Sequence, residues 1–210
     1  MPDYAVLDHT ALRELPLYQK KCTMLDALCQ AIESWWSVSS TEESARWSQK
    51  AIEAIMENWQ AYLFDGQDAA AEQIMLAANY AGRAINITAT TAAHAMSYKL
   101  TSLYGLPHGH AVALCLSEVW AFILSHPERC SDGRGIGHLT DTMTRISRLI
   151  SLEQFRSMLE KMEMSCPNAR NREEELTILS GSVNPLRLKN NPTAITQDEL
   201  RILYGRIVKE

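Results

Sequence analysis

Residues 91–110 decide how this chain folds and what chemistry it can carry, and they read TAAHAMSYKLTSLYGLPHGH. His94 falls in a stretch of helical character, and His108 follows a Gly-Leu-Pro break at the expected start of the next helix. Pro107 suits the first turn of a helix because its missing N–H is not needed there. Two imidazoles on adjacent helices can converge on one metal ion. A metal site in this stretch would separate an enzyme from a plain helical bundle.

The bulk composition bounds the size and the partners of the protein. The chain has 210 residues, 46% of them hydrophobic, which suffices for the core of one domain. The net charge is −5 and basic residues are scattered, so we expect no nucleic-acid partner and no polybasic membrane contact. No apolar run reaches the ~20 residues that span a bilayer, and the N-terminus has no secretory pattern. Five cysteines without a CxxC pair fit reduced thiols in a cytoplasmic protein.

Hydrophobic periodicity predicts helices throughout the chain after Pro16. The expected ranges are residues 22–38, 40–64, 68–87, the segment around His94, 109–124, 139–150, 152–162, 173–180 and a terminal helix after 196. Ser40 and Thr196 each precede a Glu by three positions, which is the capping-box pattern of a helix start. Residues 4–8, Tyr-Ala-Val-Leu-Asp, read as a strand without a partner. The predicted fold class is all-α, a multi-helix array behind one orphan N-terminal strand.

Asp26 is a third candidate metal ligand, far upstream of the two histidines. It lies four residues before Gln30, which places both side chains on one face of the first helix, among apolar neighbours. A buried carboxylate must be paired, hydrogen-bonded or metal-bound. An Asp with two His residues is a sound donor set for iron, zinc or nickel. Spacing alone leaves two interpretations open: a metal site, or core histidines beside an Asp that hydrogen-bonds a neighbouring helix end.

Four motifs resemble those of one known family, in order along the chain. Residues 26–33 read DALCQAIE, residues 94–100 HAMSYKL, residues 104–109 YGLPHG and residues 190–192 NNP. The corresponding patterns of the iron-containing alcohol dehydrogenases are D-A-L-x-H-A-I-E, H-A-x-x-H-x-L, Y-x-x-P-H-G and N-N-P. The resemblance covers nearly all 210 residues. It implies the multi-helix C-terminal domain of that fold, which is dehydroquinate synthase-like.

The resemblance implies that Asp26, His94 and His108 bind a catalytic metal, commonly Fe²⁺ and sometimes Zn²⁺, with Ni²⁺ as a further candidate. Position 30 is His in the family pattern and Gln here. Gln30 can therefore ligate through its amide oxygen, or water replaces it, or the site has three protein ligands. A second family His falls at position 98, so Tyr98 is a catalytic candidate through its hydroxyl. His110 is another catalytic candidate, or a polar residue beside the site.

The residues at positions 30 and 98, together with Thr101-Ser102 and Gly109-His110, resemble the phosphonoacetaldehyde reductase branch of this family. That branch implies a small aldehyde substrate with a dianionic phosphonate, and such a charge requires cations. The candidate substrate-binding residues are Lys99, Arg187, Lys189 and Asn191. Solvated helix or loop charges are the alternative interpretation of the three cations.

The family's dinucleotide-binding domain has no counterpart in this sequence. No Gly-rich loop follows a strand, so the chain offers no NAD(P)H site of its own. We interpret residues 1–16 as a strand and linker from that domain, and residues 17–210 as the helical metal-binding catalytic domain. The expected function is the metal-binding half of an NAD(P)H-dependent alcohol dehydrogenase or aldehyde reductase, inactive as this fragment alone. There the metal polarises the carbonyl for hydride transfer, and a homodimer is the expected assembly.

Two other functions stay open. A sugar-phosphate cyclase related to dehydroquinate synthase shares this architecture and uses a three-ligand metal. The Asn-Asn-Pro tail and the Asp26-Ala-Leu motif nevertheless favour the dehydrogenase side. A non-catalytic helical domain would only fold or dimerise, without any metal, so metal analysis separates it from the two enzymes.

Overall fold

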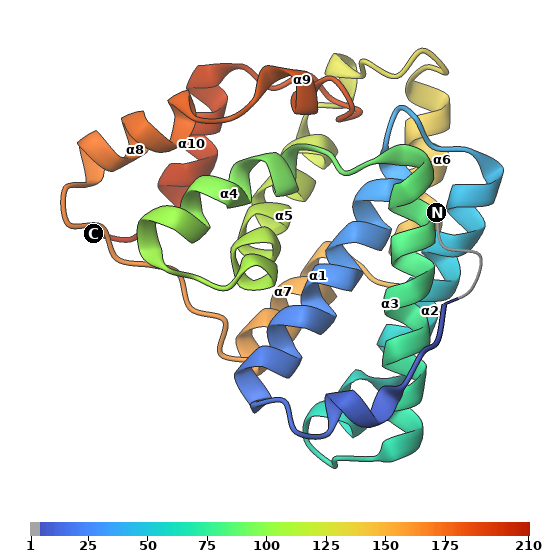
Figure 1. Ribbon diagram of the computed structural model, residues 1–210. Helices are drawn as coiled ribbons and strands as arrows, with labels where there is room; N and C mark the ends of the chain where they lie inside the picture. The colour runs from blue at the N-terminus through green and yellow to red at the C-terminus, as the bar shows by residue number, and fades with distance from the viewer. Residues whose placement is uncertain (1–4) are drawn as a thin grey trace.

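The computed structural model describes residues 5–210, and every regular element in that part of the chain is a helix (Figure 1). Strand-type pairing there is limited to two isolated bridges, Cys130–Thr193 and Asn168–Lys209. The elements in chain order are η1 (His9–Leu12), α1 (Leu17–Trp36), α2 (Glu42–Leu63), α3 (Asp68–Thr88), α4 (Ala92–Tyr104), α5 (His108–Ser125), η2 (Pro127–Arg129), α6 (Ile136–Ser147), α7 (Leu152–Lys161), α8 (Arg172–Gly181), α9 (Pro185–Leu188) and α10 (Gln197–Ile207). The predicted all-α fold class is confirmed.

Helices α1 and α5 form the centre of the core. α1 packs against α2 and α3 on one side and against α5 and α6 on another, and Figure 1 shows α1, α2 and α3 side by side. α5 packs in turn against α4, α7 and α10, while α8 pairs with α10. Both central helices are buried along most of their length. Polar side chains on these helices therefore meet at helix contacts rather than in open solvent.

Helix α5 is long and apolar enough to cross a membrane by length and composition, and no other helix in residues 5–210 passes that test. In the structure, 72% of its apolar window is buried inside the protein. Trp120 of α5 packs edge-on against Trp36 of α1 with ring centroids 5.8 Å apart, which shows how α5 fills the centre. The apolar sequence of α5 is therefore explained by burial within this fold.

The observed capping boxes of α10 and α2 can be compared with the two that the sequence predicts. Thr196 caps α10 as predicted: its side chain accepts the backbone N–H of Glu199, and the Glu199 carboxylate accepts the backbone N–H of Thr196. The box of α2 lies one residue later than the prediction from Ser40, because Thr41 and Ser44 exchange these bonds. Ser44 is fully buried, so packing selects this register over the exposed alternative.

The predicted N-terminal strand is wrong for the residues that can be described. Tyr4 lies outside the described residues, and residues 5–8 form no strand. Val6 is 93% exposed, and neither of the two isolated bridges among the described residues involves this segment. Asp8 instead caps the short helix η1, its side chain accepting the backbone N–H of Thr10. An isolated extended segment without a neighbouring strand has no ladder to join.

The remaining differences lie at helix ends and in one short helix. α1 begins at Leu17, five residues before the predicted start, whereas most other bounds agree within three residues. The sequence patterns missed α9, a single turn that starts with Pro185 after an Asn184 cap. Four residues are too few for hydrophobic periodicity to register. This short helix matters because it carries Arg187.

Candidate metal centre

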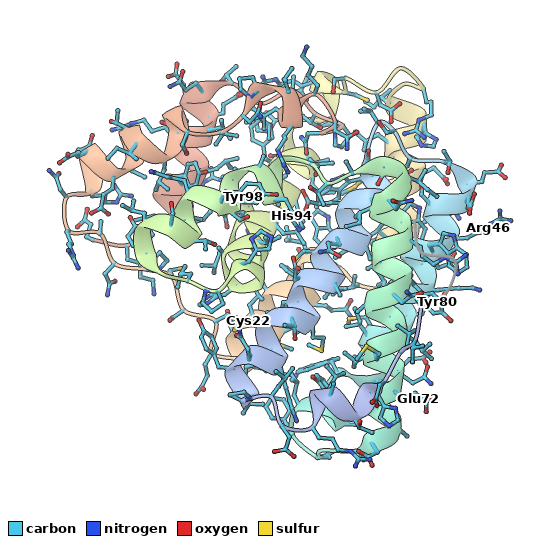
Figure 2. The ribbon with its side chains drawn as sticks, in the orientation of Figure 1. Cys22, Arg46, Glu72, Tyr80, His94 and Tyr98 are labelled. Atoms are coloured by element: carbon cyan, nitrogen blue, oxygen red, sulfur yellow. The ribbon has the colours of Figure 1, made fainter. Side chains whose placement is uncertain are left out.

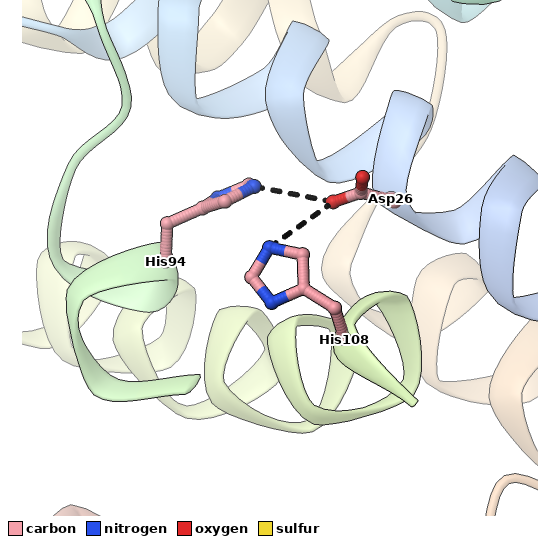
Figure 3. Close-up of side chains that lie close together, drawn as sticks. All are labelled: Asp26, His94 and His108. Atoms are coloured by element: carbon pink, nitrogen blue, oxygen red, sulfur yellow. Dashed lines mark hydrogen bonds and ion pairs between the residues drawn. The ribbon is translucent and has the colours of Figure 1, made fainter. Parts of the chain in front are cut away.

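Three helices each bring one donor to a common point. Asp26 comes from α1, His94 from α4 and His108 from α5 (Figure 3). One donor atom from each lies within 4.8 Å of the others. Asp26 Oδ1 is 3.2 Å from His94 Nε2 and 3.8 Å from His108 Nε2, and both rings are directed at that oxygen. The sequence placed these residues in separate motifs, and the structure brings all three together.

The close approach of α1 and α5 depends on Gly109. A Cβ built at this position would lie 1.9 Å from the Cys22 carbonyl oxygen and 3.0 Å from the Asp26 Cβ. No residue with a side chain fits there unless the two backbones separate. The break before α5 is equally specific, because Gly105 ends α4 in the left-handed region at φ 68°. These two glycines thus place His108 opposite Asp26.

Glu33 holds His94 from behind. It is fully buried on α1, and one carboxylate oxygen accepts the Nδ1–H of His94. The other oxygen accepts the Thr91 hydroxyl and the backbone N–H groups of Thr91 and Ala93, at 2.6, 3.0 and 3.0 Å. A carboxylate on Nδ1 fixes the tautomer that leaves Nε2 free to ligate, an arrangement common around metal-bound histidines. Sequence analysis did not assign this role, although Glu33 follows Asp26 by seven residues on the same helix face.

The charges of this pair support each other. Burial raises the pKa of Glu33, but the facing His94 and the hydrogen bonds outweigh burial, so the net pKa lies below its ordinary value. Burial likewise lowers the pKa of His94, yet the nearby carboxylates of Glu33 and Asp26 raise it overall to about 9. The two carboxylates therefore favour a positive charge at His94. A divalent cation would replace that positive charge, which suits the acidic surroundings.

His108 occupies the more open side of the cluster. Its side chain is 37% exposed, and it stacks on Tyr98 with ring centroids 5.5 Å apart and planes 19° from parallel. Burial is the main influence on its pKa, which lies below the ordinary value despite the nearby Asp26. A neutral imidazole keeps the lone pair that metal binding needs. Two imidazole nitrogens and one carboxylate oxygen thus fit a divalent first-row metal.

Gln30 reaches the cluster through Asp26. Its side-chain amide donates to Asp26 Oδ2 at 3.0 Å, and the residue is half-buried one helix turn from the Asp. The hydrogen bond leaves Oδ1, the oxygen that faces both histidines, free of this amide. In this geometry Gln30 orients the carboxylate.

Tyr98 lies one turn beyond His94 on α4 (Figure 2) and borders a separate cavity. Arg187 of α9 donates to the Tyr98 hydroxyl at 2.8 Å, and its guanidinium carbon lies 4.9 Å from the ring centroid. The cavity has a volume of about 400 Å³, and its lining includes Lys99. The structure therefore gathers Tyr98, Lys99 and Arg187, three of the predicted site residues, around one cavity, and Tyr98 also contacts His108.

Three other predicted residues lie elsewhere. His110 is buried, and its Nδ1 is 2.8 Å from the Tyr18 hydroxyl, away from the donor cluster. Lys189 lines a second cavity of about 470 Å³, which Arg187 also borders. Asn191 is only 1% exposed, and its amide donates to the Thr193 carbonyl at 2.7 Å. Neither Lys189 nor Asn191 lines the Tyr98 cavity.

Comparison with known proteins gives a consistent assignment. The family described as "Fe-containing alcohol dehydrogenase family, C-terminal" matches residues 21–208. The chain is 32% identical to phosphonoacetaldehyde reductase of Streptomyces viridochromogenes over 97% of its own length and 53% of that protein.

Two solved structures are similar in fold and sequence. The iron-containing alcohol dehydrogenase of Thermotoga maritima superposes with a TM-score of 0.82 at 27% identity, over 98% of this chain and 54% of that one. Sulfoacetaldehyde reductase of Bifidobacterium kashiwanohense, solved with NAD⁺, superposes with a TM-score of 0.74 at 27% identity, over 95% and 53%. This chain spans about half the length of these relatives. It belongs to the Fe-containing alcohol dehydrogenase family and corresponds to its helical C-terminal domain.

Proposed function

We propose that this chain is the metal-binding half of an NAD(P)H-dependent alcohol dehydrogenase or aldehyde reductase. The observation that carries the proposal is the convergence of Asp26, His94 and His108 within 4.8 Å, with Glu33 on the far nitrogen of His94. Three protein donors leave coordination positions open, which a catalytic metal needs. Fe²⁺ is the metal we propose first, because the family is the iron-containing one, with Zn²⁺ and Ni²⁺ as alternatives.

The chemistry of such a site follows from its open side. A divalent metal held there supplies Lewis-acid polarisation of a carbonyl oxygen, which favours hydride transfer to the carbon. Asp26 and the two histidines would hold that charge in place, and Gln30 hydrogen-bonds Asp26 and so orients its carboxylate. Tyr98 offers a hydroxyl at the exposed rim, where it can hydrogen-bond a substrate oxygen.

The nicotinamide cofactor is proposed to bind through residues outside this chain. NAD⁺ is bound in the Bifidobacterium relative, and this chain corresponds to about half of that protein. We further propose a cytoplasmic location and a homodimeric assembly for the complete enzyme. The proposed substrate is a small aldehyde or alcohol, with phosphonoacetaldehyde first because a relative of that name is 32% identical.

The alternatives are less well supported by the same observations. The family match covers residues 21–208 and favours a dehydrogenase over a sugar-phosphate cyclase. The donor cluster favours a metal protein over a helical domain that only folds or dimerises. Glu33 adds to this argument, because burying a carboxylate to orient a histidine is costly for a purely structural core.

Metal analysis tests the proposal. Protein purified without air is expected to contain a stoichiometric first-row metal, measured by inductively coupled plasma mass spectrometry. The variants Asp26→Asn and His94→Gln are expected to lose that metal, while His138→Gln on α6 keeps it as a matched control. A metal-free wild-type chain that also fails to bind added Fe²⁺, Zn²⁺ and Ni²⁺ overturns the proposal. So does retention of the metal by both cluster variants.

A further inference from the structure

We propose that Arg187 and Lys99 form a headgroup site for a tetrahedral oxyanion carried on the substrate, across Tyr98 from the metal cluster. This inference deepens the proposed function and rests on it for the position of the substrate aldehyde. The ligand class is a short aldehyde that bears a phosphonate or a sulfonate on the neighbouring carbon.

A continuous stack of side chains links the cavity to the donor cluster. His108 stacks on Tyr98, with ring centroids 5.5 Å apart, and the Arg187 guanidinium carbon lies 4.9 Å from the Tyr98 centroid. Arg187 is therefore no farther from the His108 ring than the sum of these two distances. A two-carbon substrate with its carbonyl oxygen at the cluster could therefore extend past Tyr98 and place its headgroup in the cavity that Lys99 and Arg187 line. The separation suits a short substrate rather than a long one.

The charges in the cavity are one-sided. Its lining residues are Ala95, Tyr98, Lys99, Ser102, Ser182, Asn184 and Arg187, and none of them is acidic. Among the described residues, neither Lys99 nor Arg187 lies within 4.0 Å of a carboxylate, whereas Arg129, Arg134 and Arg156 each pair with one. Two cations share one concavity in a chain whose net charge is −5. An anion entering it meets no repelling group among the lining residues.

The Arg187 contact leaves most of its donors available. Within the described hydrogen bonds, its guanidinium makes one, from Nη1 to the neutral Tyr98 hydroxyl at 2.8 Å. A guanidinium has five N–H donors in a planar fork that matches two oxygens of a phosphonate or sulfonate. Lys99 adds a point charge, and the Ser102 and Ser182 hydroxyls add neutral donors to the same cavity. This donor set suits a tetrahedral oxyanion better than a planar or neutral group.

Names of two relatives agree with this chemistry. The Streptomyces protein is named for phosphonoacetaldehyde and the Bifidobacterium protein for sulfoacetaldehyde. Both substrates are two-carbon aldehydes with a tetrahedral anionic head. The cavity proposed here would bind the feature that they share, while the metal cluster would bind the aldehyde.

Headgroup probes separate this inference from the metal claim. Ethylphosphonate and ethanesulfonate carry the head but no carbonyl, so they are titrated by NMR into the full chain kept metal-free with a chelator. We expect both to bind in the cavity, with the dianionic phosphonate tighter. Arg187→Met is expected to weaken ethylphosphonate binding by at least about tenfold, and Lys99→Met by less. The control variant Arg148→Met removes an exposed charge on another helix end and is expected to change nothing.

A conservative variant tests whether the bidentate geometry of the Arg187 guanidinium matters. Arg187→Lys keeps the charge but loses bidentate geometry, so we expect partial recovery between the wild type and Arg187→Met. Failure of the wild type to bind either probe overturns the inference. Equal affinity in Arg187→Met and the wild type, with circular dichroism showing both folded, also overturns it. Probe binding in a chain that binds no metal leaves the headgroup site standing and removes the proposed function alone.

Discussion

The metal cluster and the headgroup cavity are neighbours, but they are built in different ways. The cluster takes its donors from α1, α4 and α5, which also form the core, and His94 is 3% exposed. The cavity takes Lys99 from α4 but Arg187 from α9, a helix of four residues on the surface. Core packing thus fixes the first site, whereas a single surface turn completes the second. Changes in the cluster should affect stability and ligand together, and changes in the cavity should affect the ligand alone.

The Asn-Asn-Pro segment shows what holds that surface turn in place. Asn190 follows α9 and donates to the carbonyls of Thr88 and Thr90, and it accepts the Ser37 hydroxyl. Asn191 is buried against Thr193. These contacts anchor the end of α9 to α1 and to the end of α3. The motif therefore holds α9, and with it Arg187, in position. Because Asn191 is buried, this structural role fits the motif better than direct contact with a ligand.

Gly109→Ala is expected to disrupt the metal cluster most strongly without replacing any of its donors. The new methyl would collide with the Cys22 carbonyl and push α5 away from Asp26. We expect destabilisation of about 3 kcal/mol or more, together with loss of metal binding. Chemical denaturation and metal analysis measure the two effects. Gly82→Ala is the control, because a Cβ there meets nothing within 4 Å in the interior of α3. It is expected to stabilise the protein by about 0.5–1 kcal/mol.

Glu33→Gln is expected to have the next largest effect. A Gln amide can keep the contacts to Thr91 and Ala93, but its NH₂ group would then face His94 Nδ1. His94 Nδ1 must then accept, which moves the proton to Nε2 and blocks the ligating nitrogen. We expect metal affinity to fall by about 10–100-fold. Competition with a chromogenic chelator measures it.

The matched control for this variant is Glu175→Gln. Glu175 is also a buried glutamate that accepts backbone N–H groups, from Arg170 and Asn171, but it lies outside the donor cluster. Its variant is expected to keep wild-type metal affinity. An unchanged affinity in Glu33→Gln would show that the buried carboxylate serves the fold alone.

The sequence allowed the cluster to be predicted because the local motifs of its members resemble those of one family, whereas spacing alone left a metal site and core histidines both open. Asp26, His94 and His108 each sit in a helical pattern that a reader can find residue by residue. Glu33 was missed because its role comes from a contact with a residue 61 positions away. The pairing of Tyr98 with Arg187 spans 89 positions and depends on a helix too short to detect. The strand predicted at residues 4–8 is absent from residues 5–8 for a related reason, since a strand forms only where a partner strand lies beside it.

Gln30→His tests whether a fourth donor strengthens the metal cluster. It places an imidazole where the family pattern has one, one turn from Asp26. We expect metal affinity to rise by about tenfold, since a fourth donor replaces a residue that now bonds to Asp26 Oδ2. Chelator competition again gives the affinity. Gln30→Ala is the matched control and is expected to lower affinity, because the Asp26 carboxylate loses its orienting bond. Equal affinities in all three proteins would contradict both roles.

An ion pair outside both sites gives the smallest expected change in the free energy of unfolding. It tests whether a surface substitution elsewhere leaves ligand binding at the two sites unchanged. Arg129 binds the Glu199 carboxylate, which also closes the capping box of α10. Burial raises the Glu199 pKa, but the bonds to Arg129 and Thr196 outweigh it and lower the pKa to about 2. Glu199→Gln keeps the box, since Gln can fill that position, and removes only the charge. We expect a loss of about 1 kcal/mol at neutral pH.

The pH dependence of that loss follows from the depressed pKa. A carboxylate whose folded pKa lies below its ordinary value stabilises the protein above that ordinary value, near 4.5, and the contribution fades as the pH falls toward about 2. Urea titrations at several pH values should therefore show the wild type and Glu199→Gln converging between these limits. Metal affinity and probe binding at neutral pH should be the same in both. A change in metal affinity or in probe binding would show that α10 is coupled to the two sites. The cluster and the cavity would then depend on α10 as well as on the helices that carry their residues.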